Sequence, residues 1–360
     1  SRDYIIPDAA TVEIKADETA TVQFFNEKPE KPKTPDNPDN PKTPSNPSTP
    51  SNPDKAVPQT GDDNFIFLYG GLLALAVIGG GLFAAAYFKK GKYSRNTPKR
   101  KAVGIAAVSL CGLLALGSGF LMVRDLNQYS ESAGAYEDIA SHVELPEQTE
   151  APEDDNTETD PAGADPSVVL PTVDFEALRE TSPDIIGWLA LPDTAINYPV
   201  TQTDDNEYYL HHLYDGTYNK TGCLFADYEN QEDFSDRNTI IYGHNMRDGS
   251  MFGQLVRYRD EAFCQAHPTF TFDTLYETAT WQVAAVLDTA LGADELPYYT
   301  FFDADNKLDW QRRVAAITEK SLYDTGVTPA YGTQLLTLST CGDTRIGTDA
   351  RFALLAVRVG

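Results

Sequence analysis

The sequence predicts a mainly β protein: a closed β-barrel with accessory helices, preceded by two transmembrane helices. Two observations carry this prediction. Beyond residue 167, most segments are short β-type runs separated by Gly, Asn or Asp, which is typical of a closed antiparallel barrel. Before the barrel, two apolar runs, Phe65 to Phe88 and Ala102 to Val123, are each long enough to cross a bilayer as a helix.

The first residues of the chain carry a separate β pattern. Residues 9–26 alternate apolar and polar side chains, as in half-buried strands. Two strands alone are not stable in water, and this pair resembles the last hairpin of an immunoglobulin-like pilin or adhesin domain. We therefore expect residues 1–28 to be the end of such a domain. Because there is no initiator Met, we interpret the chain as a fragment of a longer product.

A proline-rich segment follows, over residues 29–56. Proline recurs at every third position from Pro29 to Pro53. The proline ring fixes φ and removes a hydrogen-bond donor, so this period predicts a polyproline II helix with one proline per turn. At roughly 3.1 Å per residue the segment would span on the order of 75 Å, which suits a spacer through a cell wall.

Residues 57–92 combine a short motif, an apolar run and a basic tail. The motif is Val57-Pro58-Gln59-Thr60-Gly61, and the basic tail is Lys89-Lys90-Gly91-Lys92. This order resembles the cell-wall sorting signal of Gram-positive surface proteins, with Val in place of the usual Leu at the first position of an LPxTG-like motif. The resemblance implies cleavage between Thr60 and Gly61.

The second apolar run belongs to residues 93–125, expected to be the membrane anchor of the C-terminal domain. The loop between the two runs is basic and has no acidic residue, so the positive-inside rule places it in the cytoplasm and both flanks outside. Glycines in both runs would let the two helices pack closely. Residues 126–166 are expected to be a disordered acidic tether, because nine acidic and no basic residues lie between Glu144 and Asp165.

Charge and cysteine content limit the function classes. The formal net charge is −26 and lies partly in the acidic tether, and the absence of a basic patch outside one short loop argues against nucleic acid as a partner. The four cysteines show no CxxC pair and no metal-type spacing, so neither a metal nor a cofactor is expected. Cys223 and Cys264 are either small buried hydrophobic residues or, in an extracellular domain, a disulfide.

Three residues near the C-terminus carry the chemistry. Cys341 ends an apolar strand-like run, His244 follows another, and Arg351 opens a third. A thiolate attacks carbonyl carbon, an imidazole can transfer the protons, and a guanidinium can stabilise the negative charge that develops on oxygen. His244 is the one histidine of five that ends a strand, and Asn245 or Asp343 could orient its ring.

These motifs resemble the sortases, and most closely class B, over residues 167–360. The resemblance rests on TIIYGHNM around His244, on GSMFGQL, and on TLSTC followed by Arg ten residues later. It implies a sortase-type barrel and a cysteine transpeptidase without a cofactor. The spacing of Leu308, Val314 and Ile317 predicts a helix between about residues 303 and 322, which the resemblance to class B also leads us to expect before the cysteine strand. Ser339 and Thr340 of the same motif are expected to contact substrate.

The implied partners are surface proteins bearing a sorting signal, and a peptidoglycan precursor or pilin lysine as acyl acceptor. The implied location is the membrane of a Gram-positive bacterium, with the catalytic domain extracellular. Two alternatives stay open: a cell-wall or pilin protein whose sortase-like module is inactive, and a cysteine peptidase that only hydrolyses. The chain is either a natural fusion or two neighbouring genes read as one.

Overall fold

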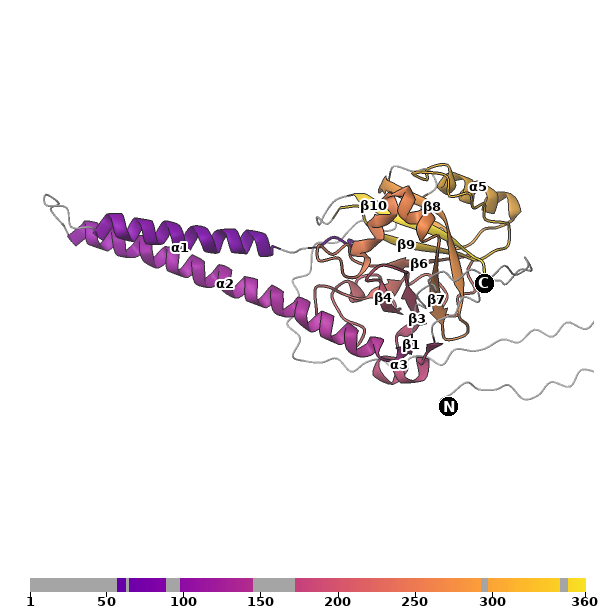
Figure 1. The fold of residues 1–360 in the computed structure, drawn as a ribbon, viewed down its shortest axis with the longest axis horizontal. Coiled ribbons are helices and arrows are strands. Elements are labelled where there is room, and N and C mark those ends of the chain that lie inside the picture. Colours follow the sequence, from indigo (N-terminus) through magenta and orange to yellow (C-terminus); the bar gives the residue numbers. More distant parts are fainter. Residues whose placement is uncertain (1–56, 63–64, 89–97, 145–171, 293–296, 344–348) are drawn as a thin grey trace, which may run out of the picture. The chain divides into compact units, whose positions relative to one another are not determined.

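The computed structural model describes residues 57–62, 65–88, 98–144, 172–292, 297–343 and 349–360 (Figure 1). Residues 54–360 belong to one compact unit. Three expectations lie outside the described residues: the immunoglobulin-like fragment (1–28), the proline-rich linker (29–56) and the part of the acidic tether beyond residue 144.

A closed eight-stranded barrel forms the body of the structure, as the sequence predicts. Its strands follow one another in the order β10-β8-β7-β3-β4-β5-β6-β9. Two neighbouring pairs, β4 with β5 and β6 with β9, are parallel, so the expectation of a purely antiparallel barrel is wrong. The strands are β3 (Ile185–Ala190), β4 (Asn197–Thr201), β5 (Leu224–Ala226), β6 (Asn238–Tyr242), β7 (Thr269–Thr274), β8 (Thr280–Ala290), β9 (Leu335–Cys341) and β10 (Ala350–Arg358).

The structure also contains short helices before and between the barrel strands, and a pair of two-residue strands that is not part of the barrel. Helix α5 gives the expected helix before the cysteine strand, and buries Trp310, Val314 and Ile317. The accessory elements are α3 (Phe175–Thr181), α4 (Glu261–Ala266), α5 (Lys307–Thr318), the 3₁₀ helices η1 (Tyr208–Leu210), η2 (Phe252–Arg259) and η3 (Tyr298–Thr300), and the antiparallel pair β1 (Val143–Glu144) and β2 (Thr172–Val173).

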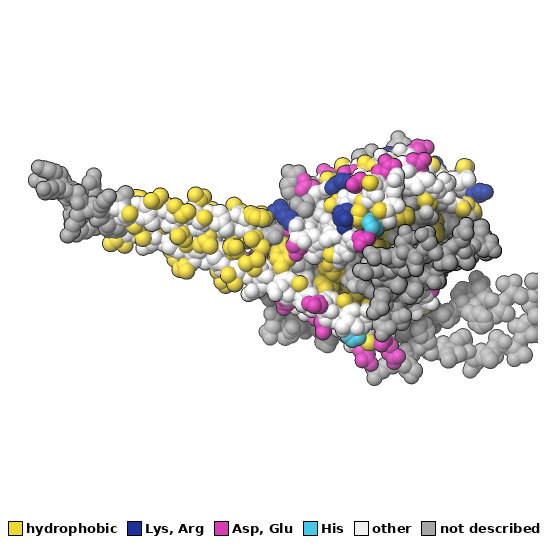
Figure 2. Space-filling model, viewed as in Figure 1, with side chains coloured by type: hydrophobic (Ala, Val, Ile, Leu, Met, Phe, Trp, Pro, Cys, Tyr) yellow, Lys and Arg dark blue, Asp and Glu magenta, His cyan; other side chains and the backbone are white. Residues whose placement is uncertain are grey.

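Two long helices, α1 (Ile66–Phe88) and α2 (Pro98–Ala140), pack against each other. Both are long and apolar enough to cross a membrane, and their side chains present a largely hydrophobic surface (Figure 2). Of the glycines expected to allow close packing, Gly80 does so, since a Cβ there would lie 2.9 Å from the Cβ of Cys111 on α2. The remaining glycines of the two apolar runs have no such neighbour within 4 Å among the described residues.

Helix α2 continues well beyond the apolar run and reaches the barrel. Residues 126–140, expected to open the disordered tether, are helical, which corrects that boundary. Tyr136 and Ile139 are 6% and 1% exposed and belong to the main hydrophobic core. Tyr129, Ser132, Tyr136 and Ile139 recur at spacings of three and four, so they share one face of the helix. Burial of this face stabilises a helix whose other face is polar.

All four cysteines lie within the described residues and are free thiols, so Cys223 and Cys264 are not joined by a disulfide. Both are buried, at 1% and 5% exposed, which agrees with their interpretation as small hydrophobic residues. Burial raises the pKa of the Cys223 thiol to about 12, so this thiol is protonated at neutral pH. A protonated, enclosed thiol is a poor nucleophile.

Candidate active site

Strand register brings the three predicted residues together. Arg351 of β10 is paired directly with Cys341 of β9. On the other side of β9, Tyr242 of β6 pairs with Ser339 in a parallel ladder, and continuing that register by two residues sets His244 beside Cys341. Since paired residues project from the same face of a sheet, this register places the imidazole and the guanidinium on the two sides of the strand that carries the thiol. Cys341 and Arg351 lie 97 and 107 positions beyond His244 in the sequence, so the three residues share one site only because β6, β9 and β10 are neighbouring strands.

Arg351 is buried beside the thiol, at 1% exposed. Its Nη1 donates to the main-chain oxygen of Ala350 at 2.9 Å and lies 3.6 Å from the Cys341 Sγ. A buried guanidinium needs acceptors that compensate for its lost hydration, and a thiolate is such an acceptor. The contact therefore places a buried positive charge beside the sulfur of Cys341.

His244 lies at 4% exposed, immediately after β6. Its Nε2 is 2.8 Å from the main-chain oxygen of Leu210, which can only accept, so Nε2 carries a hydrogen and Nδ1 is the nitrogen free to exchange a proton. Burial lowers the pKa of His244, partly opposed by the Leu210 carbonyl, so the ring is held towards its neutral, basic form.

Gly243 lets this ring approach the barrel. A Cβ at Gly243 would lie 2.3 Å from the Cδ2 of Leu224 and 2.8 Å from the ring of Phe252. Any side chain at this position would push the segment away from β5 and η2. The glycine of the YGH motif is thus required by packing and not by backbone angle.

Ser339 and Thr340, expected to contact substrate, make hydrogen bonds within the barrel. The Ser339 hydroxyl lies 2.8 Å from the hydroxyl of Tyr298, whose pKa burial raises to about 12. The Thr340 hydroxyl donates to the Gly243 carbonyl at 2.7 Å. Both side chains therefore tie the end of β9, just before the thiol, to η3 and to the segment that follows β6.

The groove beside these residues is filled by residues 57–62 of the same chain. Val57, Thr60 and Asp62 are 7%, 1% and 3% exposed, whereas Gln59 is exposed to solvent. A single residue pairing of parallel type joins Gly61 to Asn245. The described residues therefore bring both Thr60 and Gly61, the residues of the predicted cleavage point, next to the segment that carries His244.

Main-chain contacts hold this segment. The Asn245 N–H donates to the Thr60 carbonyl at 2.8 Å, and Nη2 of Arg351 donates to the Pro58 carbonyl at 3.4 Å. The side-chain amide of Asn245 donates to the Cys341 carbonyl at 2.8 Å. Asn245 is a candidate for orienting the imidazole; in the structure it instead connects the Thr60 carbonyl with the cysteine strand, a role that the sequence does not signal.

Similarity to known proteins agrees with this geometry. The chain matches the family model of the sortase domain over residues 189–359. It is 38% identical to a sortase B of Listeria monocytogenes over 164 residues, covering 46% of this chain and 65% of that protein. It is 31% identical to a sortase B of Staphylococcus aureus over 182 residues, covering 51% of this chain and 73% of that protein.

A crystal structure of sortase B from B. anthracis superimposes with a TM-score of 0.52 at 32% identity, covering 65% of this chain and 99% of that structure. The matched regions include the strands that bring Cys341, His244 and Arg351 together. The chain therefore belongs to the sortase family of cysteine transpeptidases, with class B sortases among its relatives.

Proposed function

We propose that this chain is a membrane-anchored sortase that cuts its own VPQTG segment between Thr60 and Gly61. The observation that supports this most strongly is the occupied groove. Thr60 is buried, its carbonyl accepts the Asn245 N–H, and the Pro58 carbonyl accepts from Arg351. A peptide held by its main chain beside a thiol, an imidazole and a guanidinium is arranged for acyl transfer.

The proposed reaction has two steps. His244 takes the proton of Cys341 as the sulfur attacks the Thr60 carbonyl carbon, and the resulting thioester forms while the bond to the Gly61 nitrogen breaks. His244 gives that proton to the departing Gly61 amine. An incoming amine then attacks the thioester carbon and loses its proton through His244 to the leaving Cys341 sulfur, which restores the free thiol.

Two donors are suited to the oxyanion of this reaction. The Asn245 N–H already bonds the Thr60 carbonyl, and Arg351 lies within 3.6 Å of the attacking sulfur. Donors that are fixed before the reaction stabilise developing charge without a reorganisation cost. Arg351 therefore contacts the nucleophilic sulfur and donates to the Pro58 carbonyl. It would also stabilise the negative charge that develops on the Thr60 oxygen.

The proposed setting is the membrane of a Gram-positive bacterium, spanned by α1 and α2, with the barrel outside. Cleavage at Thr60 would release residues 1–60, with their proline-rich spacer, and leave Gly61 as the first residue of the anchored enzyme. The acyl acceptor would be an amine of a peptidoglycan precursor or a pilin lysine. Other surface proteins with sorting signals would be substrates in trans.

The test uses the full chain in detergent micelles, with and without triglycine as the amine. Intact mass and N-terminal sequencing should show one product beginning at Gly61 and the other ending at Thr60, joined to triglycine when that is present. Cys341→Ala removes only a buried sulfur and should stay folded but uncut. Cleavage of the Cys341→Ala chain at the same bond would refute the assignment of the nucleophile.

The same experiment separates the two alternatives. A hydrolytic peptidase would leave a free Thr60 carboxylate even at high triglycine concentration, whereas a transpeptidase gives the amide product faster than the acid. An inactive module would leave the chain whole. The intact pairing of Arg351 with Cys341, and the neutral, basic form of His244, favour the transpeptidase over the inactive module.

A further inference from the structure

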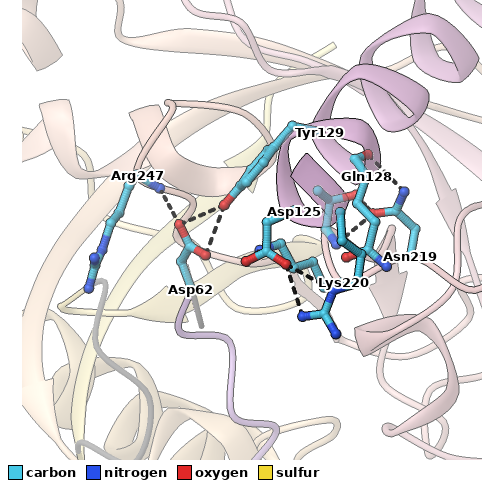
Figure 3. A network of polar contacts seen from close by, with 9 residues as sticks. Asp62, Asp125, Gln128, Tyr129, Asn219, Lys220 and Arg247 are labelled. Carbon is cyan, nitrogen blue, oxygen red and sulfur yellow. Dashed lines mark hydrogen bonds and ion pairs between the residues drawn. The ribbon is translucent and has the colours of Figure 1, made fainter. Parts of the chain in front are cut away.

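The second residue after the cleavage point, Asp62, is bound by the membrane-anchoring helix α2. Its carboxylate is 3% exposed, and the hydroxyl of Tyr129 on α2 lies 3.0 and 3.1 Å from its two oxygens. The main-chain N–H of Arg247 donates to Oδ2 at 3.1 Å. Figure 3 shows Asp62 between these two donors, with the Arg247 side chain directed away from it. Here, the Asp62 clamp means Tyr129 together with the Arg247 N–H.

Polar contacts with the barrel hold Tyr129 in place. Asp125, one turn earlier on α2, forms a buried ion pair of 2.8 Å with Lys220, whose Nζ lies 4.9 Å above the centre of the Tyr129 ring. The side chain of Asn219 donates to the Gln128 carbonyl at 2.9 Å (Figure 3). The helix is therefore fixed to the barrel on the turn that carries Tyr129, and the clamp depends on this docking.

The clamp favours a carboxylate over other side chains. Both of its groups are donors here, and both oxygens of a carboxylate can accept, so Asp62 satisfies them together. An asparagine has one accepting oxygen, so the Tyr129 hydroxyl would have to turn and accept from its NH₂ group, and neither hydrogen bond would be strengthened by a negative charge. A lysine has no acceptor at all. Because the residue at position 62 is almost closed to water, a side chain there that fails to accept both hydrogen bonds is poorly compensated by solvent.

We propose that α2 forms part of the substrate site, and that the Asp62 clamp selects sorting signals with a carboxylate two residues after the cleaved Thr. This inference rests on the proposed function, since it concerns the same groove. By this proposal the anchor helix contributes to substrate specificity: the barrel recognises residues 57–60, and α2 recognises the residue after Gly61. A barrel without α2 would cut such signals with no preference for the acid.

The test measures peptide preference in the full chain carrying Asp62→Ala, after it has cut itself, because its own clamp is then vacant. Two peptides, VPQTGDA and VPQTGNA, are compared by kcat/KM in detergent micelles. We expect the Asp peptide to be preferred about tenfold, the usual scale for hydrogen bonds to a charged group. Adding Tyr129→Phe should reduce the preference to about twofold or threefold, because the Arg247 N–H remains.

Tyr136→Phe is the matched control on the same helix. The Tyr136 hydroxyl donates to the Gly222 carbonyl at 2.6 Å, so it helps to dock α2 without touching Asp62. It should lower kcat/KM for both peptides by the same factor and leave their ratio unchanged. Equal kcat/KM for the two peptides, or a Tyr129→Phe effect that is the same for both, would overturn the proposal.

Failure of the proposed function can be told apart from failure of this inference. If neither peptide is cut, hydrogen exchange of the Asn245 amide in the full Cys341→Ala chain still reports whether residues 57–62 occupy the groove, because that amide is bonded to Thr60. Faster exchange of this amide in Cys341→Ala with Tyr129→Phe or with Asp62→Asn supports the clamp. Unchanged exchange in both variants refutes it, whatever the catalytic outcome.

Discussion

Arg351 and Cys341 face each other across β10 and β9, with Nη1 of the arginine 3.6 Å from the cysteine sulfur. The same guanidinium reaches the Pro58 carbonyl through Nη2 at 3.4 Å. One buried cation therefore touches both the nucleophile and the bound peptide. Its planar fork allows this, because two nitrogens point in different directions from one fixed plane.

Arg351→Lys should lower the first-order rate of self-cleavage on the order of a hundredfold, comparable with the loss of an oxyanion donor. A lysine keeps the charge but presents a single nitrogen, so it cannot serve Cys341 and Pro58 at once. The rate is measured by quenching the full chain at intervals and resolving the Gly61 product by mass. A rate within twofold of the parent chain would remove Arg351 from the reaction.

The pH dependence of cleavage should reflect His244. Burial lowers its pKa below the ordinary value of 6.5, and the neutral ring is the form that accepts the thiol proton. As pH falls through this lowered pKa the ring becomes protonated and the rate should fall. The acid limb of the rate profile should therefore have its midpoint below pH 6.5; a midpoint above 6.5 would contradict the neutral-base mechanism.

Removal of α2 should weaken the barrel. A piece covering residues 167–360 lacks Tyr136 and Ile139, which are buried in its core, whereas a piece covering 124–360 retains them. Each such side chain stabilises the fold by about 1.5–3 kcal/mol, so the shorter piece should melt roughly 10 °C lower. Differential scanning calorimetry of both pieces tests this, with Ile139→Ala in the longer piece as an intermediate. Equal melting temperatures would show that α2 does not contribute to the core.

Asp273→Asn should stabilise the protein at alkaline pH. Asp273 of β7 is 1% exposed, and burial raises its pKa from 3.8 to about 7. The Asp273 carboxyl ionises at a lower pH in the unfolded chain than in the folded protein. Its ionisation therefore destabilises the folded protein fully above pH 7, and this destabilisation disappears as pH falls towards 4. The asparagine side chain carries no charge, so the substitution removes this destabilisation, which is at most a few kcal/mol. Thermal unfolding at pH 8 and pH 4 checks this: a gain at pH 4 as large as at pH 8 would contradict the sign.

Local sequence patterns were sufficient to predict a barrel and two apolar helices, and to select three candidate residues for the chemistry. The apolar runs around Gly80 and Cys111 predict helices because length and hydropathy are local properties. Cys341, His244 and Arg351 could be selected because each stands at the end of an apolar strand-like run, where a reactive side chain can meet others. Helix α5 followed from its spacing of apolar residues.

The pairing of strands could not be obtained in this way. The parallel contacts of β4 with β5 and of β6 with β9 depend on which strands meet after the chain has folded, and no short segment encodes them. The prediction that the second half of α2 belongs to a disordered tether is wrong for a related reason. Residues 126–140 are too polar to be recognised as a core helix, and only the barrel surface that covers Tyr136 and Ile139 makes the helix stable.

What the sequence determined by itself was the barrel, the two apolar helices, the VPQTG motif and the choice of Cys341, His244 and Arg351 as candidates, since each depends on contiguous residues. Only the tertiary structure decided that Asn245 bonds Thr60, that Arg351 reaches Pro58, and that Tyr129 bonds Asp62. These contacts join residues far apart along the chain. Their geometry comes from the docking of α2 and from the register of the barrel, which are properties of the packed core as a whole.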